Sequence, residues 1–257
     1  MSAVLKVSGM SHWFGGLKAV SNFDFEVPEG AIYGLIGPNG SGKTTTFNLI
    51  TGIYKPTEGK IEFSGGDITG AKPYRIVRKG VARTFQNLRI FGSMSVLDNV
   101  RVARQYKPVS TLLASTLRLP SFKAEERQRK AEALRLLDVL HLADRAKEQA
   151  KNLPYGELRR LEIARALATE PKLLLLDEPA AGMNPKEVQD LMALIARVRD
   201  EFKVTVFLIE HHMKFVMGLC ERIKVLDFGE TIAEGKPEAV AKDPRVLEAY
   251  LGKKGGH

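Results

Sequence analysis

Lys43 and Thr44 close a glycine-rich stretch that is suited to holding phosphate groups. The stretch fits the spacing Gly-x-x-x-x-Gly-Lys-Ser/Thr. Glycines let the backbone bend so that successive N–H groups point at phosphate oxygens, Lys43 brings a positive charge to the β- and γ-phosphates, and the Thr44 hydroxyl can ligate Mg²⁺. The stretch therefore predicts a nucleoside triphosphate site, formed by Gly37, Pro38, Asn39, Gly40, Ser41, Gly42, Lys43, Thr44 and Thr45.

The segments on either side of this stretch must position it. The apolar run 31–36 is typical of a buried strand, and 45–53 can be a helix that starts near Gly42. The first turn of such a helix adds unsatisfied N–H donors and the positive end of its dipole. An ordinary glycine-rich turn is the alternative interpretation, and these two flanks favour the phosphate site.

Two further apolar runs end in residues suited to phosphate chemistry. The run 173–176 leads into Asp177 and Glu178, and the run 204–209 leads into Glu210 and His211. In an open α/β sheet, ligands lie at the carboxyl ends of the strands. Asp177 suits work on Mg²⁺, which prefers oxygen ligands, while Glu178 is placed to polarise a water and His211 to reach a γ-phosphate. Three such strand ends in one chain predict a hydrolytic site.

The remaining pattern predicts an α/β fold. Apolar strands that alternate with helices at 157–169 and 185–201 favour a parallel sheet covered on both faces. In 20–27, apolar and polar residues alternate, as in a half-solvated antiparallel strand. Further helices are expected at 73–79, 123–140 and 238–251, and an irregular connector or insertion at 106–122. We expect a nucleotide-binding core with an antiparallel β-subdomain at 1–94 and 156–257, and a helical subdomain at 95–155.

Composition narrows the class of protein. The 257 residues are 44% apolar and 27% charged, and they contain no apolar run long enough to cross a membrane. The first residues lack the apolar core of a secretory signal. Cys220 is the one cysteine, which excludes an internal disulfide and fits a reducing cytoplasm, and it is expected to fill core space. MgATP and a position at a membrane surface account for the formal charge of +9, so we expect no nucleic-acid partner.

Three segments carry a family resemblance, namely 152–166, 177–187 and 208–214. With the phosphate-binding stretch, they make the chain resemble the nucleotide-binding subunits of ABC transporters from about Val4 to Gly252. Within that superfamily the chain looks most like the ATP-binding subunit of the branched-chain amino acid importers. The insertion at 106–122 and the ending at 248–252 also fit this subgroup.

The resemblance implies a P-loop NTPase core of the ABC ATPase type and a role for each matching residue. Phe14 takes the place of the aromatic residue that stacks on adenine, and Gln86 that of the glutamine that senses Mg²⁺ and couples to the membrane subunit. Asp177 belongs to the Mg²⁺ site with Thr44 and Gln86. The catalytic residues are Glu178 as the carboxylate, His211 as the switch histidine, and Lys43. The signature loop, which in this family closes over ATP bound to the opposite subunit, consists of Leu153, Pro154, Tyr155, Gly156 and Glu157.

The resemblance also implies partners and a location. ATP and Mg²⁺ are the expected cofactors, and membrane permease subunits and a second ATPase subunit, either a sister chain or a copy of itself, are the expected partners. A periplasmic amino-acid-binding protein would act indirectly. The protein would lie at the cytoplasmic face of the inner membrane, bound peripherally.

Several of these residues also have a purely structural interpretation. Phe14 could be a core residue, and Gln86 could be an ordinary surface residue at a strand end. The pair His211 and His212 could bind a metal, but adjacent residues at a strand end face opposite ways, which argues against a metal site. The stretch 64–67 resembles a signature sequence superficially and is interpreted as a turn.

The chain departs from the family pattern near the signature loop and after the catalytic strands. Pro154 and Tyr155 replace the usual serine and glycine, Asn184 replaces an aspartate, and His212 stands where this subgroup commonly has an aspartate. None of these changes touches Lys43, so hydrolysis is expected to survive, with weaker anion binding at the signature loop.

Three alternatives stay open. The chain could serve a related exporter, such as the lipopolysaccharide export ATPase, although Pro154 and Tyr155 argue against it. It could be a non-transport ABC ATPase acting on nucleic acid or ribosomes, although it has neither a second ATPase unit nor a long coiled-coil insertion. A simple P-loop kinase would not need the segment 153–166.

Overall fold

The computed structural model describes residues 3–104 and 120–251. Contacts between residues divide the chain into two units, one formed by 1–86 with 172–257 and the other by 87–171. Most of the predicted insertion at 106–122 lies outside the described residues.

A six-stranded sheet forms the centre of the first unit, in the order β10-β9-β3-β8-β7-β6. Every neighbouring pair from β9 to β6 is parallel, and β10 pairs antiparallel with β9. The strands are β3 (Ile32–Ile36), β6 (Val81–Arg83), β7 (Leu173–Asp177), β8 (Thr205–Ile209), β9 (Arg222–Asp227) and β10 (Glu230–Gly235). The predicted α/β fold with a parallel sheet is confirmed.

A second, antiparallel sheet has the order β2-β1-β4-β5. Its strands are β1 (Ala3–Phe14), β2 (Leu17–Pro28), β4 (Glu58–Phe63) and β5 (Gly66–Asp67). In β2 the apolar residues Phe23, Phe25 and Val27 are buried, whereas the polar residues between them are exposed. The predicted alternation is therefore confirmed, and it gives this strand one core face and one solvent face.

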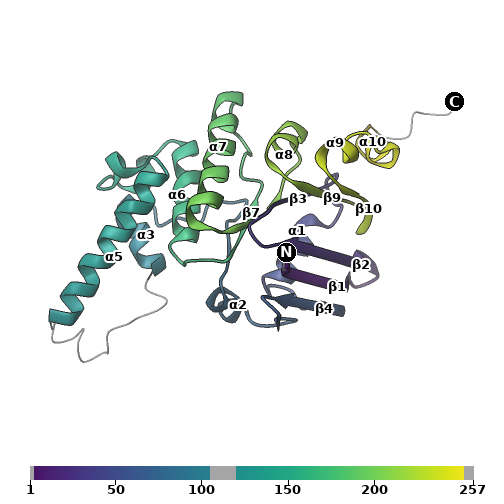
Figure 1. Ribbon diagram of the computed structural model, residues 1–257, viewed down its shortest axis with the longest axis horizontal. Helices are drawn as coiled ribbons and strands as arrows, with labels where there is room; N and C mark the ends of the chain where they lie inside the picture. Colours follow the sequence, from purple (N-terminus) through teal and green to yellow (C-terminus); the bar gives the residue numbers. More distant parts are fainter. Residues whose placement is uncertain (1–2, 105–119, 252–257) are drawn as a thin grey trace. The chain divides into compact units, whose positions relative to one another are not determined.

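The core of the first unit lies between the two sheets. Alternate residues of the central strands, such as Leu35, Leu175 and Phe207, share one cluster with Phe25 of β2 and with Phe47 of α1 (Lys43–Ile50). The opposite face of the six-stranded sheet carries α7 (Pro185–Phe202) and α8 (Met213–Leu219), as Figure 1 shows. The other helices of this unit are α2 (Pro73–Lys79), α9 (Pro237–Val240) and α10 (Pro244–Leu251).

The predicted continuous helix at 238–251 is wrong. The chain forms α9 and α10 with a break between them at 241–243. Pro244 begins α10, and a proline cannot continue a preceding helix because it lacks an N–H and clashes with the previous turn. Asp243 closes the break by accepting hydrogen bonds from the Arg245 backbone and side chain.

The second unit is helical, with α3 (Val96–Arg104), α5 (Pro120–Val139), α6 (Tyr155–Leu167) and the short 3₁₀ turns η1 (Ala143–Arg145) and η2 (Ala150–Asn152). Ser95 begins α3 as expected, because its Oγ accepts a hydrogen bond from the Asp98 backbone N–H at 3.0 Å. Because α6 packs against α3 and α5, contacts place it in this unit. The unit therefore spans 87–171, a longer range than the helical subdomain expected from the sequence at 95–155.

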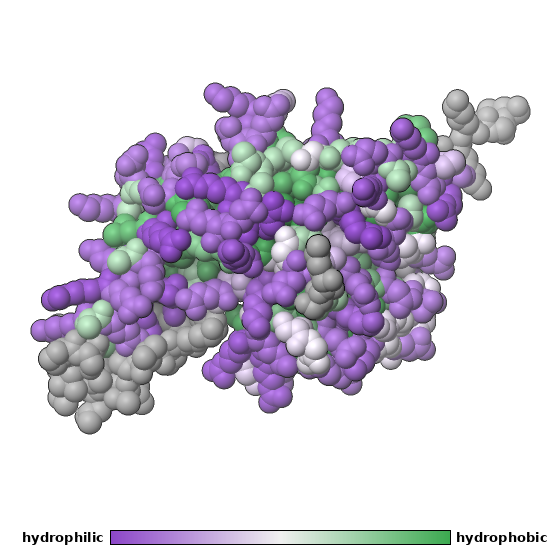
Figure 2. Space-filling view, in the orientation of Figure 1, coloured by the Kyte–Doolittle hydropathy of each residue, from purple (hydrophilic) through white to green (hydrophobic). Residues whose placement is uncertain are grey.

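Hydrophilic residues cover most of the face seen in Figure 2, with apolar residues visible between them. Among the described residues, no helix combines the length and the apolar character that crossing a membrane requires.

Candidate functional site

The phosphate-binding stretch connects β3 to α1 and contains backbone that only glycine tolerates. Gly42 has a φ of 102° and caps α1. A Cβ at this residue would lie 2.5 Å from the Ala19 carbonyl oxygen, and one at Gly37 would lie 2.1 Å from the Leu226 carbonyl oxygen. The two glycines therefore hold the stretch against β2 and β9 and direct its amides towards the start of α1.

Lys43 places its ammonium group inside this loop. The side chain is buried, and its Nζ donates hydrogen bonds to the carbonyl oxygens of Gly37 and Pro38, both at 2.8 Å. Burial lowers the pKa of Lys43, and the nearby carboxylates of Glu178 and Asp177 partly offset this effect. A phosphate oxygen can compete for the same donors, so Lys43 is prepared to exchange two carbonyl contacts for a charged one.

A pocket of about 460 Å³ opens beside the loop, a size typical of small-molecule sites. It is lined by Asn39 to Thr45 together with Phe14, Gln86, Glu178 and Phe228. The structure thus brings together the predicted loop, the predicted aromatic residue and two of the predicted polar side chains. Phe14 is 44% exposed rather than a core residue, and its ring packs edge-on against Tyr54 at 5.3 Å between centroids.

Asp177 ends β7 and is buried next to the pocket. Its Oδ2 forms an ion pair with Arg83 Nη2 at 2.7 Å, and both side chains are almost fully buried. Arg83 also donates from Nη1 to Asn48 Oδ1 at 2.7 Å, so it ties β6 and β7 to α1. Sequence reasoning missed Arg83; the only available signal was an arginine within the short strand before Gln86.

Glu178 follows Asp177 in a left-handed backbone conformation, with a φ of 47°. Its backbone N–H donates to the Ile209 carbonyl oxygen at 3.0 Å, which anchors the turn after β7 to β8. Gln86 Nε2 donates to Glu178 Oε2 at 3.0 Å, and His211 Nδ1 lies 3.6 Å from Glu178 Oε1. Gln86 and His211, predicted from separate segments, therefore meet around the Glu178 carboxylate.

Glu210 lies at one of the predicted strand ends but had no predicted role of its own, and it is fully buried. Its Oε1 accepts a hydrogen bond from the Ala180 backbone N–H at 2.9 Å, and its Oε2 accepts one from the His211 backbone N–H at 3.1 Å. The carboxylate thus connects the loop after Glu178 with the loop after β8. Local sequence offered only a glutamate at the end of an apolar run.

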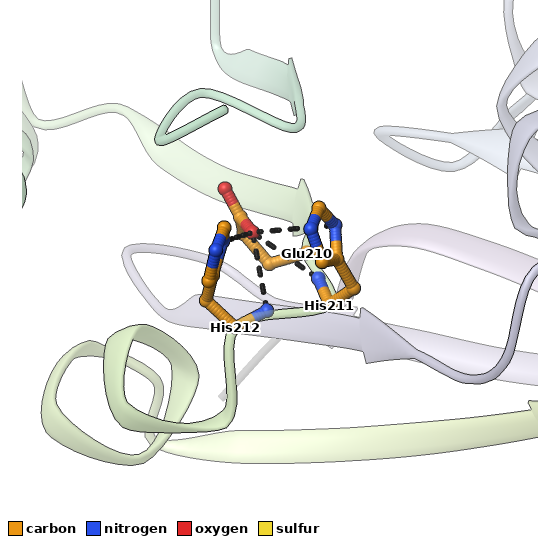
Figure 3. A group of neighbouring side chains, drawn as sticks. All are labelled: Glu210, His211 and His212. Atoms are coloured by element: carbon orange, nitrogen blue, oxygen red, sulfur yellow. Dashed lines mark hydrogen bonds and ion pairs between the residues drawn. The ribbon is translucent and has the colours of Figure 1, made fainter. Parts of the chain in front are cut away.

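His211 and His212 lie on the same side of the backbone, which contradicts the expectation that they face opposite ways. Their ring centroids are 4.3 Å apart, and both rings lie against Glu210 (Figure 3). The alternation of a strand does not apply to them because β8 ends at Ile209 and the chain turns into α8 with His212 as its N-cap residue.

The predicted signature loop lies in the second unit, at the start of α6. Pro154 is the N-cap residue of α6 and makes no side-chain cap hydrogen bond. Tyr155 Oη accepts hydrogen bonds from Arg159 Nε at 3.1 Å and from Nη2 at 2.7 Å. Arg145 Nε lies 3.6 Å from Glu157 Oε2, while Leu153 is buried. Tyr155 therefore has a local structural role besides any contact with a ligand.

Asn184, the third departure from the family pattern, begins α7. Its Oδ1 accepts hydrogen bonds from the backbone N–H groups of Lys186 and Glu187, and the Glu187 carboxylate accepts one from the Asn184 N–H at 2.9 Å. This reciprocal capping box stabilises the helix start, a role that asparagine performs as well as aspartate.

Family models match two parts of the chain. The model described as ABC transporter matches residues 20–181, and the model described as branched-chain amino acid ATP-binding cassette transporter matches residues 230–255. The second match covers β10, α9 and α10.

Curated relatives match over nearly the whole length. The high-affinity branched-chain amino acid transport ATP-binding protein BraF of Pseudomonas aeruginosa is 47% identical, covering 97% of this chain and 98% of its own. The corresponding LivG protein of Escherichia coli is 45% identical with the same coverage. A probable LivG of Archaeoglobus fulgidus is 36% identical, covering 97% of this chain and 95% of its own.

Solved structures agree with these matches. A crystal structure of an ATP-binding cassette of an ABC transporter in its ADP conformation superposes with a TM-score of 0.86 at 32% identity, covering 98% of this chain and all of the other. A dimeric ATP-binding cassette in a post-hydrolysis state, bound to ADP and phosphate, gives a TM-score of 0.75 at 25% identity, with coverage of 91% and 98%.

Proposed function

The chain belongs to the ABC transporter family, and we propose that it is the ATP-hydrolysing subunit of an importer of branched-chain amino acids. The assignment of branched-chain amino acids as the cargo rests on the 47% identity to BraF over nearly the full length of both chains. The observation that carries the chemistry is the Glu178 carboxylate, which lines the pocket beside the phosphate loop.

The phosphate loop binds the triphosphate, and Lys43 neutralises charge on it. Phe14 lines the pocket and is 44% exposed, so its ring is available to adenine. The adenine contact is available in the ground state, so it chiefly sets nucleotide affinity, whereas the Lys43 charge also stabilises the γ-phosphate during hydrolysis.

Mg²⁺ fits the oxygen-rich side of this pocket. Thr44 and Gln86 line it directly and would hold the ion, while Asp177 is buried, bonded to Arg83 and suited to orienting the ion's water ligands. When bound, Mg²⁺ would neutralise negative charge on the phosphate oxygens.

Glu178 and His211 carry out the proton chemistry. Glu178 orients the attacking water and accepts its proton, while Gln86 holds Oε2 of the same carboxylate at 3.0 Å. His211, 3.6 Å from Glu178 Oε1, stabilises the charge that develops on the γ-phosphate. Because phosphoryl transfer depends mostly on positioning and electrostatics, removing either group should reduce turnover more than binding.

The site is completed by a second ATPase subunit, either a sister chain or a second copy. Leu153 to Glu157 of one subunit closes over the nucleotide held by the other. A related cassette is a dimer in a post-hydrolysis state with ADP and phosphate, which supports this arrangement. Pro154 offers no hydroxyl to the γ-phosphate, so the backbone N–H groups at the start of α6 provide the contact.

Hydrolysis reopens the dimer and moves membrane permease subunits through the Gln86 segment. The protein binds these permeases at the cytoplasmic face of the inner membrane, and a periplasmic amino-acid-binding protein delivers the cargo. The relatives that are named as branched-chain amino acid transport proteins support this assembly.

The proposal is tested by reconstituting this chain with the permease subunits and the binding protein that genes neighbouring its own encode. Leucine-loaded binding protein is expected to stimulate ATP hydrolysis and uptake into vesicles that carry the complex. Purification with permeases of an exporter, or ATP hydrolysis that no branched-chain amino acid stimulates, would overturn the assigned cargo.

A further inference from the structure

Histidine side chains and backbone N–H groups surround the buried carboxylate of Glu210. In residues 3–104 and 120–251, the side chains of His211 and His212 lie within 4.0 Å of this carboxylate, and neither Lys nor Arg pairs with it. Its other contacts are backbone N–H groups, from Ala180, His211 and His212. A buried carboxylate is stable when hydrogen bonds and a nearby cation offset the loss of water, and a bound metal ion would supply that cation here.

Two histidine side chains, both of a type that can bind metal ions, meet at this carboxylate. His212 Nδ1 lies 3.2 Å from Glu210 Oε2, and His211 Nδ1 lies 4.0 Å from the same oxygen. One ligand atom from each of the three residues falls within 4.8 Å of the others, and the two rings flank the carboxylate in Figure 3. The side chains of His211 and His212 are 43% and 49% exposed, so an ion can enter from solvent. Glu210 would bind the ion on its buried side.

We propose that Glu210, His211 and His212 form a binding site for a divalent transition metal of the Zn²⁺ class. Two imidazoles and one carboxylate suit Zn²⁺ and its neighbours, whereas Mg²⁺ prefers oxygen ligands. The site is therefore chemically different from the Mg²⁺ site of the pocket. Water completes the coordination on the exposed side.

The consequence for turnover rests on the proposed function. His211 lies between two carboxylates, 3.6 Å from Glu178 Oε1 and 4.0 Å from Glu210 Oε2. A metal bound through His211 Nδ1 holds the ring at Glu210 and removes it from the catalytic group. Because Lys43 and the phosphate loop are untouched, the metal should lower hydrolysis while leaving nucleotide binding in place.

Direct binding is measured on the full chain without nucleotide and with any affinity tag removed. Zn²⁺ is expected to bind at one ion per chain by titration calorimetry, and Co²⁺ should give the visible absorption of a histidine-ligated ion. His212→Gln should weaken Zn²⁺ binding by at least about tenfold, as expected when a site loses part of its ligand set. His141→Gln removes an exposed histidine elsewhere, and Cys220→Ala removes the thiol, and both should bind Zn²⁺ as the unaltered chain does.

Inhibition is measured on the same proteins under saturating MgATP. Zn²⁺ should inhibit the unaltered chain and both control variants, while His212→Gln should keep basal hydrolysis within about twofold and resist Zn²⁺. Absence of stoichiometric Zn²⁺ binding, or equally tight binding by His212→Gln, overturns the metal site. Binding is scored without nucleotide, so a chain that proved not to hydrolyse ATP would overturn the proposed function and leave the metal result standing.

Discussion

Arg83 and Asp177 form a buried ion pair, with 2.7 Å between Nη2 and Oδ2 and with 6% and 4% of their side chains exposed. The pair joins the strand that leads to Gln86 with the strand that leads to Glu178. Arg83 also donates from Nη1 to Asn48 Oδ1 and Thr51 Oγ1, at 2.7 and 3.2 Å, so the same guanidinium group reaches the phosphate-loop helix. One side chain therefore fixes the relative position of three elements that carry the proposed chemistry.

Replacing Arg83 measures how much this ion pair contributes to the free energy of unfolding. Arg83→Met leaves the Asp177 charge buried without its partner, and the expected loss is about 3–5 kcal/mol in the free energy of unfolding. Adding Asp177→Asn to Arg83→Met removes that charge and should recover part of the loss. Urea unfolding of the two single variants and the double variant measures the coupling. Strictly additive effects would show that the pair contributes no interaction energy.

Glu178→Gln should separate binding from hydrolysis. The amide keeps the shape of the side chain but cannot accept a proton, so turnover should fall at least about a hundredfold. The variant should still bind MgATP and should accumulate as a dimer, which gel filtration with light scattering detects.

Glu221→Gln is the matched control, because Glu221 is an exposed partner of Arg199 at the surface. This variant should hydrolyse ATP at the normal rate. Normal turnover by Glu178→Gln would remove Glu178 from its assigned role.

Much of the fold and the site was predictable because the informative patterns are local. The loop that leads to Lys43 follows β3, Asp177 ends β7 and Glu178 follows it, and strand ends of a parallel sheet meet at one edge. The pairing of Arg83 with Asp177 joins residues 94 positions apart, and no local pattern reports it. The orientation of His211 and His212 was mispredicted because strand alternation was extended past Ile209, where β8 ends.

Cys220 should be unreactive in the folded protein. Burial raises the pKa of its thiol, and Glu210 and Glu221 raise it further. Thiolate is the reactive form, so labelling by a disulfide reagent at pH 8 should be at least about a hundredfold slower than in denaturant, where the chain has opened. Cys220→Ala, which leaves no thiol, gives the background rate. Equal rates with and without denaturant would contradict the burial of this residue.

The same pKa shift has a consequence for stability. Above the ordinary thiol pKa of 9.0, the unfolded chain loses the Cys220 proton while the folded chain keeps it. The folded state then binds more protons, so the contribution of Cys220 to stability falls as the pH rises past that value. Cys220→Ala should show a smaller loss of stability between neutral and alkaline pH in urea unfolding.

Pro154→Ser should strengthen the signature loop in two measurable ways. Pro154 is the N-cap residue of α6 without a side-chain cap bond, and a serine there can accept a hydrogen bond from the first turn. Pro154→Ala is the control because it also removes the proline ring but supplies no hydroxyl. Relative to this control, Pro154→Ser should raise the free energy of unfolding by about 1 kcal/mol. A hydroxyl that reaches the γ-phosphate across the dimer makes a hydrogen bond to a charged group, so the KM for ATP should also fall about tenfold. A gain in stability without any change in KM would mean that residue 154 does not contact nucleotide.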